Sequence, residues 1–219
     1  MTDLNRTLAQ VLAINFDAAE QKAIQDAIVL VANNGATSRF SVPLLGLYVP
    51  GNYISPASTA RANGVVTGSD GVMDLVPLVV TERLDISEVG NNVQTGVGGT
   101  AFQVLIYDGD GPYGYAGSLL YKSGTISAAS AGWASEAANI ILEPNRLYWV
   151  GVQYSGSPLL SGRISPETQS IGVISNVGAE ANILRKSTTF GDAPGNWGFA
   201  TTDLAVASAI NVRLRIRPQ

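Results

Sequence analysis

The sequence contains no cysteine and no histidine. Without cysteine there is no disulfide, no thiolate metal ligand and no cysteine nucleophile. Without histidine the chain lacks the side chain most often used for proton transfer near neutral pH, so a Ser-His-Asp triad and a conventional zinc site are excluded. Catalysis by paired carboxylates or by lysine stays open. The 219 residues are enough to bury a sizeable core without disulfides or structural metal ions.

Charged side chains are also scarce. They make up 14% of the sequence, whereas ordinary soluble domains carry about 25%. So little charge indicates that much of the surface is buried against other protein chains, most simply against identical subunits. The formal net charge of -4 argues against nucleic acid as a partner.

Long apolar runs are missing as well. The start of the sequence lacks a basic patch followed by an unbroken apolar stretch, so we expect no signal peptide. The longest apolar stretch near the start, residues 27–32, is far too short to span a bilayer. The sequence therefore predicts a chain that is made in a cytoplasm and does not insert into a membrane.

Residues 1–35 carry the helical part of the sequence. Asp17 followed by Glu20 is typical of a helix start, and residues 34–35, Asn-Gly, are typical of a helix end. Between them, apolar residues recur on one face at helical spacing. These residues are Ala23, Ile24, Ala27, Ile28 and Val31. The segment predicts either a helix packed on its own domain or an anchoring and trimerisation segment that contacts the same helices of neighbouring subunits.

Residues 36–219 change to short β-rich runs separated by Gly, Pro, Asn, Asp and Ser. No helical pattern separates these runs, so a parallel βαβ arrangement is disfavoured. The predicted fold is mainly β, an antiparallel jelly-roll-like β-sandwich over residues 36–219 with a short N-terminal α-helical segment. Pro77, inside a strand-like run, predicts an edge or a bulge. The predicted strands are residues 73–81, 84–89, 101–108, 119–126, 136–142, 147–154, 170–175 and 209–217.

The last of these strands shows the clearest alternation. Its apolar and polar residues alternate one by one, which puts them on opposite faces. Arg213 and Arg215 lie on the polar face. They predict either a solvated or inter-subunit face or a site for an anionic ligand, such as a phosphate-bearing surface sugar.

Several short signatures follow one another between residues 51 and 154. They are GNYISP at 51–56, MDLVPLVV at 73–80, VLIYD at 104–108, a Pro/Gly loop and strand at 112–120, and LEPNRLYWV at 142–150. This order resembles a β-sandwich module of tail-fibre tips, baseplate proteins and other appendages of tailed bacteriophages. The resemblance does not extend to the helical start, and residues 155–199 fit it less well.

The resemblance implies a virion structural protein, and members of this group are typically homotrimers. We therefore expect a homotrimeric tail fibre or tail-tip subunit, located in the virion, that binds a host surface glycan and contacts other tail, baseplate or capsid proteins. Two alternatives stay open, because fold does not determine function. One is a capsid decoration protein or head fibre, and the other is a bacterial carbohydrate-binding module, which needs neither trimer nor helix.

Aromatic residues in turn-like sequence are the main candidates for glycan binding, because flat rings can stack on sugar faces. Tyr113 and Tyr115 lie in a predicted loop, and Trp133 and Trp197 lie beside glycines. The competing interpretation is that Trp149 and Tyr107 are core residues and that Trp133 and Trp197 pack at subunit contacts. The predicted receptor-binding set is Tyr113, Tyr115, Trp133, Trp197, Arg213 and Arg215.

Residues 109–114 formally match a dinucleotide-binding glycine pattern. Pro112 and the glycines after it cannot open the helix that such a site needs, so we expect no cofactor. Asp108 and Asp110 are weak candidates for calcium, since alternating carboxylates suit a hard cation, but no bidentate glutamate follows at the required spacing. A plain turn is favoured there.

Glycan hydrolysis would need two acids that face one cleft. The acids of the β region form no recognisable motif, and the repeats of a parallel β-helix are absent. We therefore expect a binding protein and not an enzyme. The acids considered are Asp85, Glu88, Glu136, Glu143, Glu167, Glu180, Asp192 and Asp203.

Overall fold

The computed structural model describes residues 48–56, 64–163, 173–174, 180–181 and 183–218. The helical segment predicted for residues 1–35 and most of the strand predicted for residues 170–175 lie outside them. Within the described part of the chain, no helix is long and apolar enough to cross a membrane.

The described residues form short and long strands with two single-turn 3-10 helices, η1 (Pro112–Gly114) and η2 (Thr201–Asp203). The prediction of a mainly β fold is therefore confirmed. The strands are β1 (Tyr53–Ile54), β2 (Gly64–Thr67), β3 (Val72–Val80), β4 (Leu84–Thr95), β5 (Ala101–Asp108), β6 (Leu119–Lys122), β7 (Ile126–Ser127), β8 (Gly132–Leu142), β9 (Arg146–Ser155), β10 (Leu159–Arg163), β11 (Val173–Ile174), β12 (Glu180–Ala181), β13 (Ile183–Ser187), β14 (Leu204–Ala205), β15 (Ala209–Ile210) and β16 (Arg213–Ile216).

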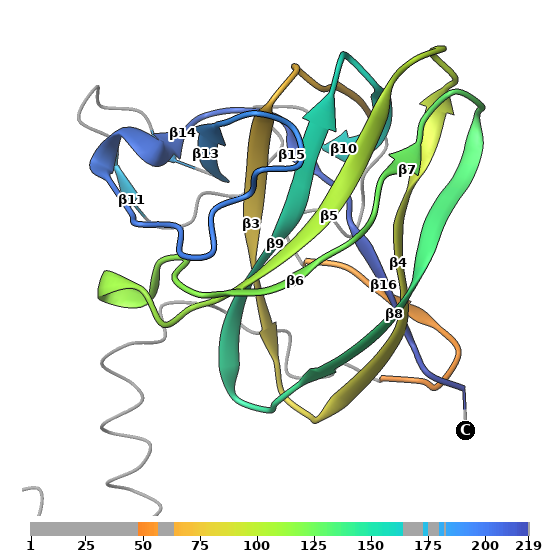
Figure 1. The fold of residues 1–219 in the computed structure, drawn as a ribbon. Helices are drawn as coiled ribbons and strands as arrows, with labels where there is room; N and C mark the ends of the chain where they lie inside the picture. The colour runs from red at the N-terminus through yellow and green to blue at the C-terminus, as the bar shows by residue number, and fades with distance from the viewer. Residues whose placement is uncertain (1–47, 57–63, 164–172, 175–179, 182, 219) are drawn as a thin grey trace, which may run out of the picture. The chain divides into compact units, whose positions relative to one another are not determined.

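Two antiparallel sheets face each other (Figure 1). Sheet A has the order β1-β16-β4-β10-β15, with β2 on β10 and β8 on β4, and sheet B has the order β14-β13-β3-β9-β5-β6, with β7 on β5. In sheet A, β8 pairs along one side of β4, and β16 and β10 share its other side. The predicted antiparallel β-sandwich is confirmed.

The main core lies between the sheets and is built by alternate residues of each strand. Phe102, Val104 and Ile106 of β5 face inward and are fully buried, as the period of two along a strand requires. Val89 of β4 and Leu214 of β16 meet them from sheet A. Burying such side chains stabilises the fold by about 1.5–3 kcal/mol each.

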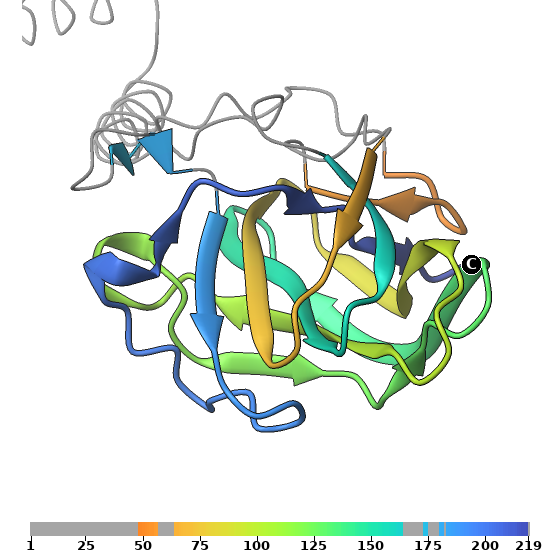
Figure 2. The ribbon, with the colours of Figure 1, turned by 90° about the horizontal axis from the view of Figure 1, so that it is seen from above.

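A second core covers the outer side of sheet B. The residues of β5 that alternate with the inward set, Leu105 and Tyr107, are also fully buried. Trp197, in the loop of residues 188–203, packs against them together with Trp149. In the view from above this C-terminal loop, drawn in blue, runs along the sandwich (Figure 2). Because both of its faces are covered, sheet B carries continuous apolar runs and not alternating ones.

Two details of the strands have local causes. β3 is not an edge strand of sheet B, because it lies between β13 and β9. Its pairing with β13 ends at Leu75, however, so the part of β3 that contains Pro77 pairs with β9 and not with β13, which suits a residue without an N–H. The predicted strand over residues 209–217 is split into β15 and β16. At the split, the buried Asn91 amide donates to the carbonyls of Ser161 and Asn211, at 3.1 and 3.0 Å, beside a backbone hydrogen bond from Asn211 to Ser161.

Candidate binding surface

The outer face of sheet A carries an aromatic and charged group built from four adjacent strands. Leu214 and Ile216 of β16 are buried, so alternation directs Arg213 and Arg215 outward. The strand register aligns Arg215 with Tyr53 of β1 on one side and with Glu88 of β4 on the other. This orientation follows because Leu214 and Ile216 of β16 pack in the main core.

Trp133 of β8 completes the group, which we call the aromatic–arginine surface: Tyr53, Glu88, Trp133, Arg213 and Arg215. The rings of Tyr53 and Trp133 meet edge to face, with centroids 5.0 Å apart and planes at 72°, a favourable geometry for two aromatic rings. Tyr53 is 40% exposed and Trp133 is 38% exposed. Two large rings therefore stand open to solvent in fixed positions.

Glu88 holds these side chains in place. Its carboxylate accepts hydrogen bonds from Trp133 Nε1 at 2.7 Å and from the Tyr53 hydroxyl at 3.3 Å, and it pairs with Arg215 at 3.2 Å. Partial burial raises the pKa of Glu88, but the donors Ser135, Trp133, Arg215 and Tyr53 outweigh it and leave the pKa lowered. Glu88 is therefore an ionised anchor at neutral pH and not a proton donor.

The two arginines also contact the rings. The Arg215 guanidinium carbon lies 5.7 Å from the Tyr53 ring centroid, and that of Arg213 lies 5.9 Å from the Trp133 ring centroid. Both distances are within the range of cation–π attraction. Burial, and then the charge of Glu88, raise the pKa of the Tyr53 hydroxyl, which keeps it protonated as a donor.

The structure thus brings together three residues of the set predicted from the sequence, Trp133, Arg213 and Arg215. It adds Tyr53 and Glu88, which the sequence did not single out for binding. Tyr53 lies in a two-residue strand with little periodicity, and a bulge between Ile86 and Glu88 fixes the direction of the Glu88 side chain. Such a bulge leaves no clear sequence signal.

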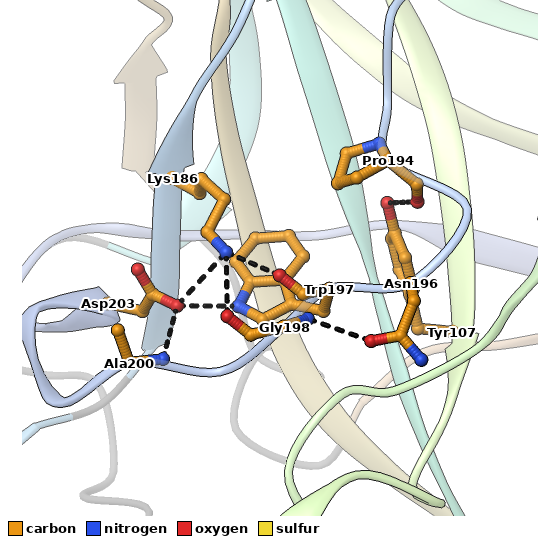
Figure 3. A network of polar contacts seen from close by, with 8 residues as sticks. All are labelled: Tyr107, Lys186, Pro194, Asn196, Trp197, Gly198, Ala200 and Asp203. Atoms are coloured by element: carbon orange, nitrogen blue, oxygen red, sulfur yellow. Dashed lines mark hydrogen bonds and ion pairs between the residues drawn. The ribbon is translucent and has the colours of Figure 1, made fainter.

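Trp197 is placed differently, because its side chain is 1% exposed and fills the second core. Its indole donates to Asp203 at 3.0 Å, and Lys186 lies 4.9 Å above the ring. Figure 3 shows the Lys186 ammonium and the Asp203 carboxylate paired with each other close to the indole nitrogen, and the Tyr107 hydroxyl hydrogen-bonded to the Pro194 carbonyl nearby. A ring so enclosed cannot stack on an external sugar, which corrects the prediction for Trp197.

The two tyrosines of the β5–β6 loop differ from each other. Tyr115 is stacked on Phe199, with centroids 3.8 Å apart, and more loosely on Trp149, at 6.1 Å. Tyr113 on η1 is 96% exposed and has a left-handed backbone, with φ of 58°. The loop belongs to sheet B, so Tyr113 and Tyr115 are not part of the aromatic–arginine surface of sheet A.

Asp108 and Asp110, the carboxylates considered for metal binding, are engaged by the protein's own donors. Asp108 pairs with Arg146, and Asp110 accepts hydrogen bonds from the backbone N–H and hydroxyl of Ser118, both at 2.7 Å. These bonds lower the pKa of Asp110. Within the described part of the chain, no three acidic side chains gather as metal ligands would.

Three of the acids considered for catalysis, Asp85, Glu136 and Glu143, also have local partners, whereas Glu167 lies outside the described residues. Asp85 pairs with Arg217 at 2.9 Å, and Glu143 pairs with Arg83 at 3.7 Å. Glu136 accepts a hydrogen bond from the backbone of Gly124 at 3.0 Å. These contacts are typical of structural ion pairs and loop anchors.

The fold and the surface together define a two-layer β-sandwich with an exposed aromatic–arginine face. No protein-family model matches the chain, and no curated protein matches it.

Proposed function

We propose that this chain is a non-enzymatic binding protein that attaches to a saccharide through the aromatic–arginine surface. The observation that carries the proposal is the pair of exposed rings, Tyr53 and Trp133, held in position by the Glu88 carboxylate. Ordering side chains on binding costs about 0.5–1.5 kcal/mol each. Rings that are already fixed by hydrogen bonds avoid part of this cost.

The chemistry of the surface suits a sugar. One face of a sugar ring presents C–H groups, whose slight positive charge complements the negative face of an aromatic ring. Sugar hydroxyls need hydrogen-bond partners around that contact, and Arg213 and Arg215 supply donors. A few polar groups placed around aromatic rings are typical of sites that recognise small polar ligands.

We further propose that the chain is a tail-fibre or tail-tip subunit of a tailed-phage virion. The strand order supports this proposal, since β2-β10-β4-β8 facing β3-β9-β5-β6 is the order of a jelly roll, a topology common in viral shells and lectins. Two of the sequence signatures also coincide with described elements, namely β5 (Ala101–Asp108) and the turn before β9 (Arg146–Ser155).

Trimerisation belongs to the same proposal. Several copies of a weak site on one particle give avidity that a single site lacks. A head fibre or capsid decoration protein is the competing placement, and immunogold labelling of intact particles separates the two. Gold at the tail end supports attachment, whereas gold over the head would support decoration.

Replacing Trp133 with alanine tests the binding surface directly. Trp133 belongs to neither buried core, so the fold should persist while the exposed ring is lost. We expect binding to a microarray of bacterial surface polysaccharides to weaken about tenfold, because stacking on one ring contributes about 1 kcal/mol or more.

Tyr113→Ala is the matched control, because it also removes an exposed ring but from the β5–β6 loop. It should leave polysaccharide binding unchanged. If Trp133→Ala bound as well as the unmodified chain while Tyr113→Ala lost binding, the site would lie on the loop and not on sheet A.

A further inference from the structure

We infer that the saccharide is acidic and that Arg213 binds its carboxylate or phosphate group. This inference rests on the proposed function, and it adds a ligand class and a specificity-determining residue to it. The starting point is the charge of the aromatic–arginine surface. Arg213 and Arg215 carry two positive charges, and Glu88 carries one negative charge, so the group has an unbalanced cation.

The unbalanced cation can be assigned to Arg213. Arg215 pairs with Glu88 at 3.2 Å, and Arg217, the next arginine along the strand, pairs with Asp85 at 2.9 Å. Among the residues that the structure describes, no carboxylate lies within ion-pair distance of Arg213. Its contact is the Trp133 ring.

The placement of Arg213 suits an anion on a sugar. A guanidinium carries five N–H donors in one plane, which match a carboxylate or phosphate. The Arg213 guanidinium lies 5.9 Å from the centroid of the same exposed ring on which a sugar would pack. A sugar on Trp133 therefore has a cation beside it whose charge no protein carboxylate neutralises.

The charge of the whole chain favours a saccharide over nucleic acid. The formal net charge of -4 repels a long polyanion, and nucleic-acid affinity comes mainly from many neutralised phosphates. One unpaired arginine next to an aromatic ring instead fits a ligand with spaced acidic groups and uncharged sugar faces between them.

The experiment compares one polysaccharide with and without its acid. Polysaccharides on the microarray are grouped as neutral, uronate-bearing and phosphate-bearing. The best-bound acidic polysaccharide is then either carboxyl-reduced or dephosphorylated, which removes the charge and keeps the sugar. We expect carboxyl reduction of a uronate-bearing polysaccharide, or dephosphorylation of a phosphate-bearing one, to weaken binding about tenfold. A loss of this size is in the range of one charge-assisted hydrogen bond.

Variants of the arginines supply the second half of the test. Arg213→Gln should lose about tenfold in affinity for the acidic polysaccharide, and it should show no further loss when the ligand's acid is also removed. Arg217→Gln is the matched control, since Arg217 follows directly after β16 and already pairs with Asp85, and it should bind as the unmodified chain does. Arg213→Lys keeps the charge but loses the planar donors, so its affinity should lie between the two.

The outcomes separate this inference from the proposed function. If neutral polysaccharides bind equally well through Trp133 and Arg213→Gln has no effect, the acidic ligand is wrong while the saccharide site stands. If no polysaccharide binding depends on Trp133, the proposed function itself fails. Binding of double-stranded DNA that is lost in Arg213→Gln would overturn the saccharide in favour of nucleic acid.

Discussion

At the scale of single residues, Glu88 is the side chain that joins other members of the proposed binding surface. It accepts hydrogen bonds from both exposed rings and pairs with Arg215. Each of these contacts needs the ionised carboxylate or is strengthened by it. The surface should therefore respond to the protonation of one group.

The pH dependence follows from the direction of the Glu88 shift. The pKa of Glu88 is lowered from its ordinary value of 4.5. The hydrogen bonds and the ion pair that need the ionised carboxylate are therefore fully present above about pH 4.5, and they are lost as the pH falls through the folded-state pKa. We expect polysaccharide binding to be constant from pH 5 to pH 8 and to fall below about pH 4.5. Binding isotherms across this range measure it.

Glu88→Gln is the control for this titration, because it keeps the shape and removes the ionisable group. It should bind more weakly at pH 7 and show a flatter profile below pH 5. An unmodified chain whose binding declined already between pH 7 and pH 5 would contradict the assignment to Glu88.

Tyr113 and Tyr115 give a second prediction at the residue scale. Tyr113 is exposed with a left-handed backbone, a conformation that asparagine tolerates better than tyrosine. Tyr113→Asn should therefore keep or raise the free energy of unfolding by up to about 0.5–1 kcal/mol. Tyr115→Asn should lower it by about 2–3 kcal/mol, because stacking on Phe199 and Trp149 is lost.

Urea unfolding of both variants measures this difference, and each variant is the other's control because the substitution is the same. Equal destabilisation by the two changes would mean that the Tyr113 side chain supports the fold and is not free for a ligand.

At the scale of elements, the sequence predicted strands best where their apolar residues are dense. The predicted strand over residues 101–108 coincides with β5, and the alternation of residues 213–216 matches β16. In the binding surface, the same alternation correctly placed Arg213 and Arg215 on one outer face. These signals survive because they depend on the period of the strand alone.

Other elements depend on contacts that a sequence does not display. The strand β10 was missed because it is short and contains Gly162, yet a Cβ at this glycine would lie 2.2 Å from Val66 and 2.6 Å from the Ala209 carbonyl. Close approach of the backbones requires glycine there. Trp197 was expected at the surface because glycines flank it, but a second core outside sheet B buries it.

Lys186 of β13 makes this second core testable as an element. Its ammonium donates to the carbonyls of Trp197 and Gly198 and pairs with Asp203 at 3.3 Å (Figure 3). Breaking a fully buried pair costs about 3–5 kcal/mol. Lys186 is 25% exposed and Asp203 keeps other donors, so we expect Lys186→Met to lower the free energy of unfolding by about 2–3 kcal/mol.

Lys122→Met is the matched control, because Lys122 donates to the carbonyl of Gly191 in the same loop but from an exposed position. It should cost less than about 1 kcal/mol. Hydrogen exchange of residues 188–203 should rise in Lys186→Met and not in Lys122→Met. Equal protection in both variants would show that Lys186 does not hold the loop.

At the scale of the whole sandwich, the two sheets have different outer faces. The outer side of sheet B is closed by the loop that carries Trp197, whereas the outer side of sheet A exposes Tyr53 and Trp133. Among the described residues, the outer side of sheet A has no such second core, and it is this side that carries the proposed binding surface. If the proposed surface binds a ligand, recognition and the second core occupy different faces, and changes on one should leave the other intact.

This separation leads to a prediction for the chain without residues 1–35. Among the described residues, the buried members of the main core lie between Val66 and Ile216, so we expect the shortened chain to keep its unfolding midpoint. If residues 1–35 form the proposed trimerisation segment, the shortened chain should sediment as a monomer. It should then bind a dissolved oligosaccharide with the same affinity as the full chain. It should adhere to a dense polysaccharide surface about a hundredfold more weakly than the full chain, because avidity is lost. Sedimentation and surface binding of both chains test whether residues 1–35 form the trimerisation segment. A shortened chain that stays trimeric would place the subunit contact within the sandwich.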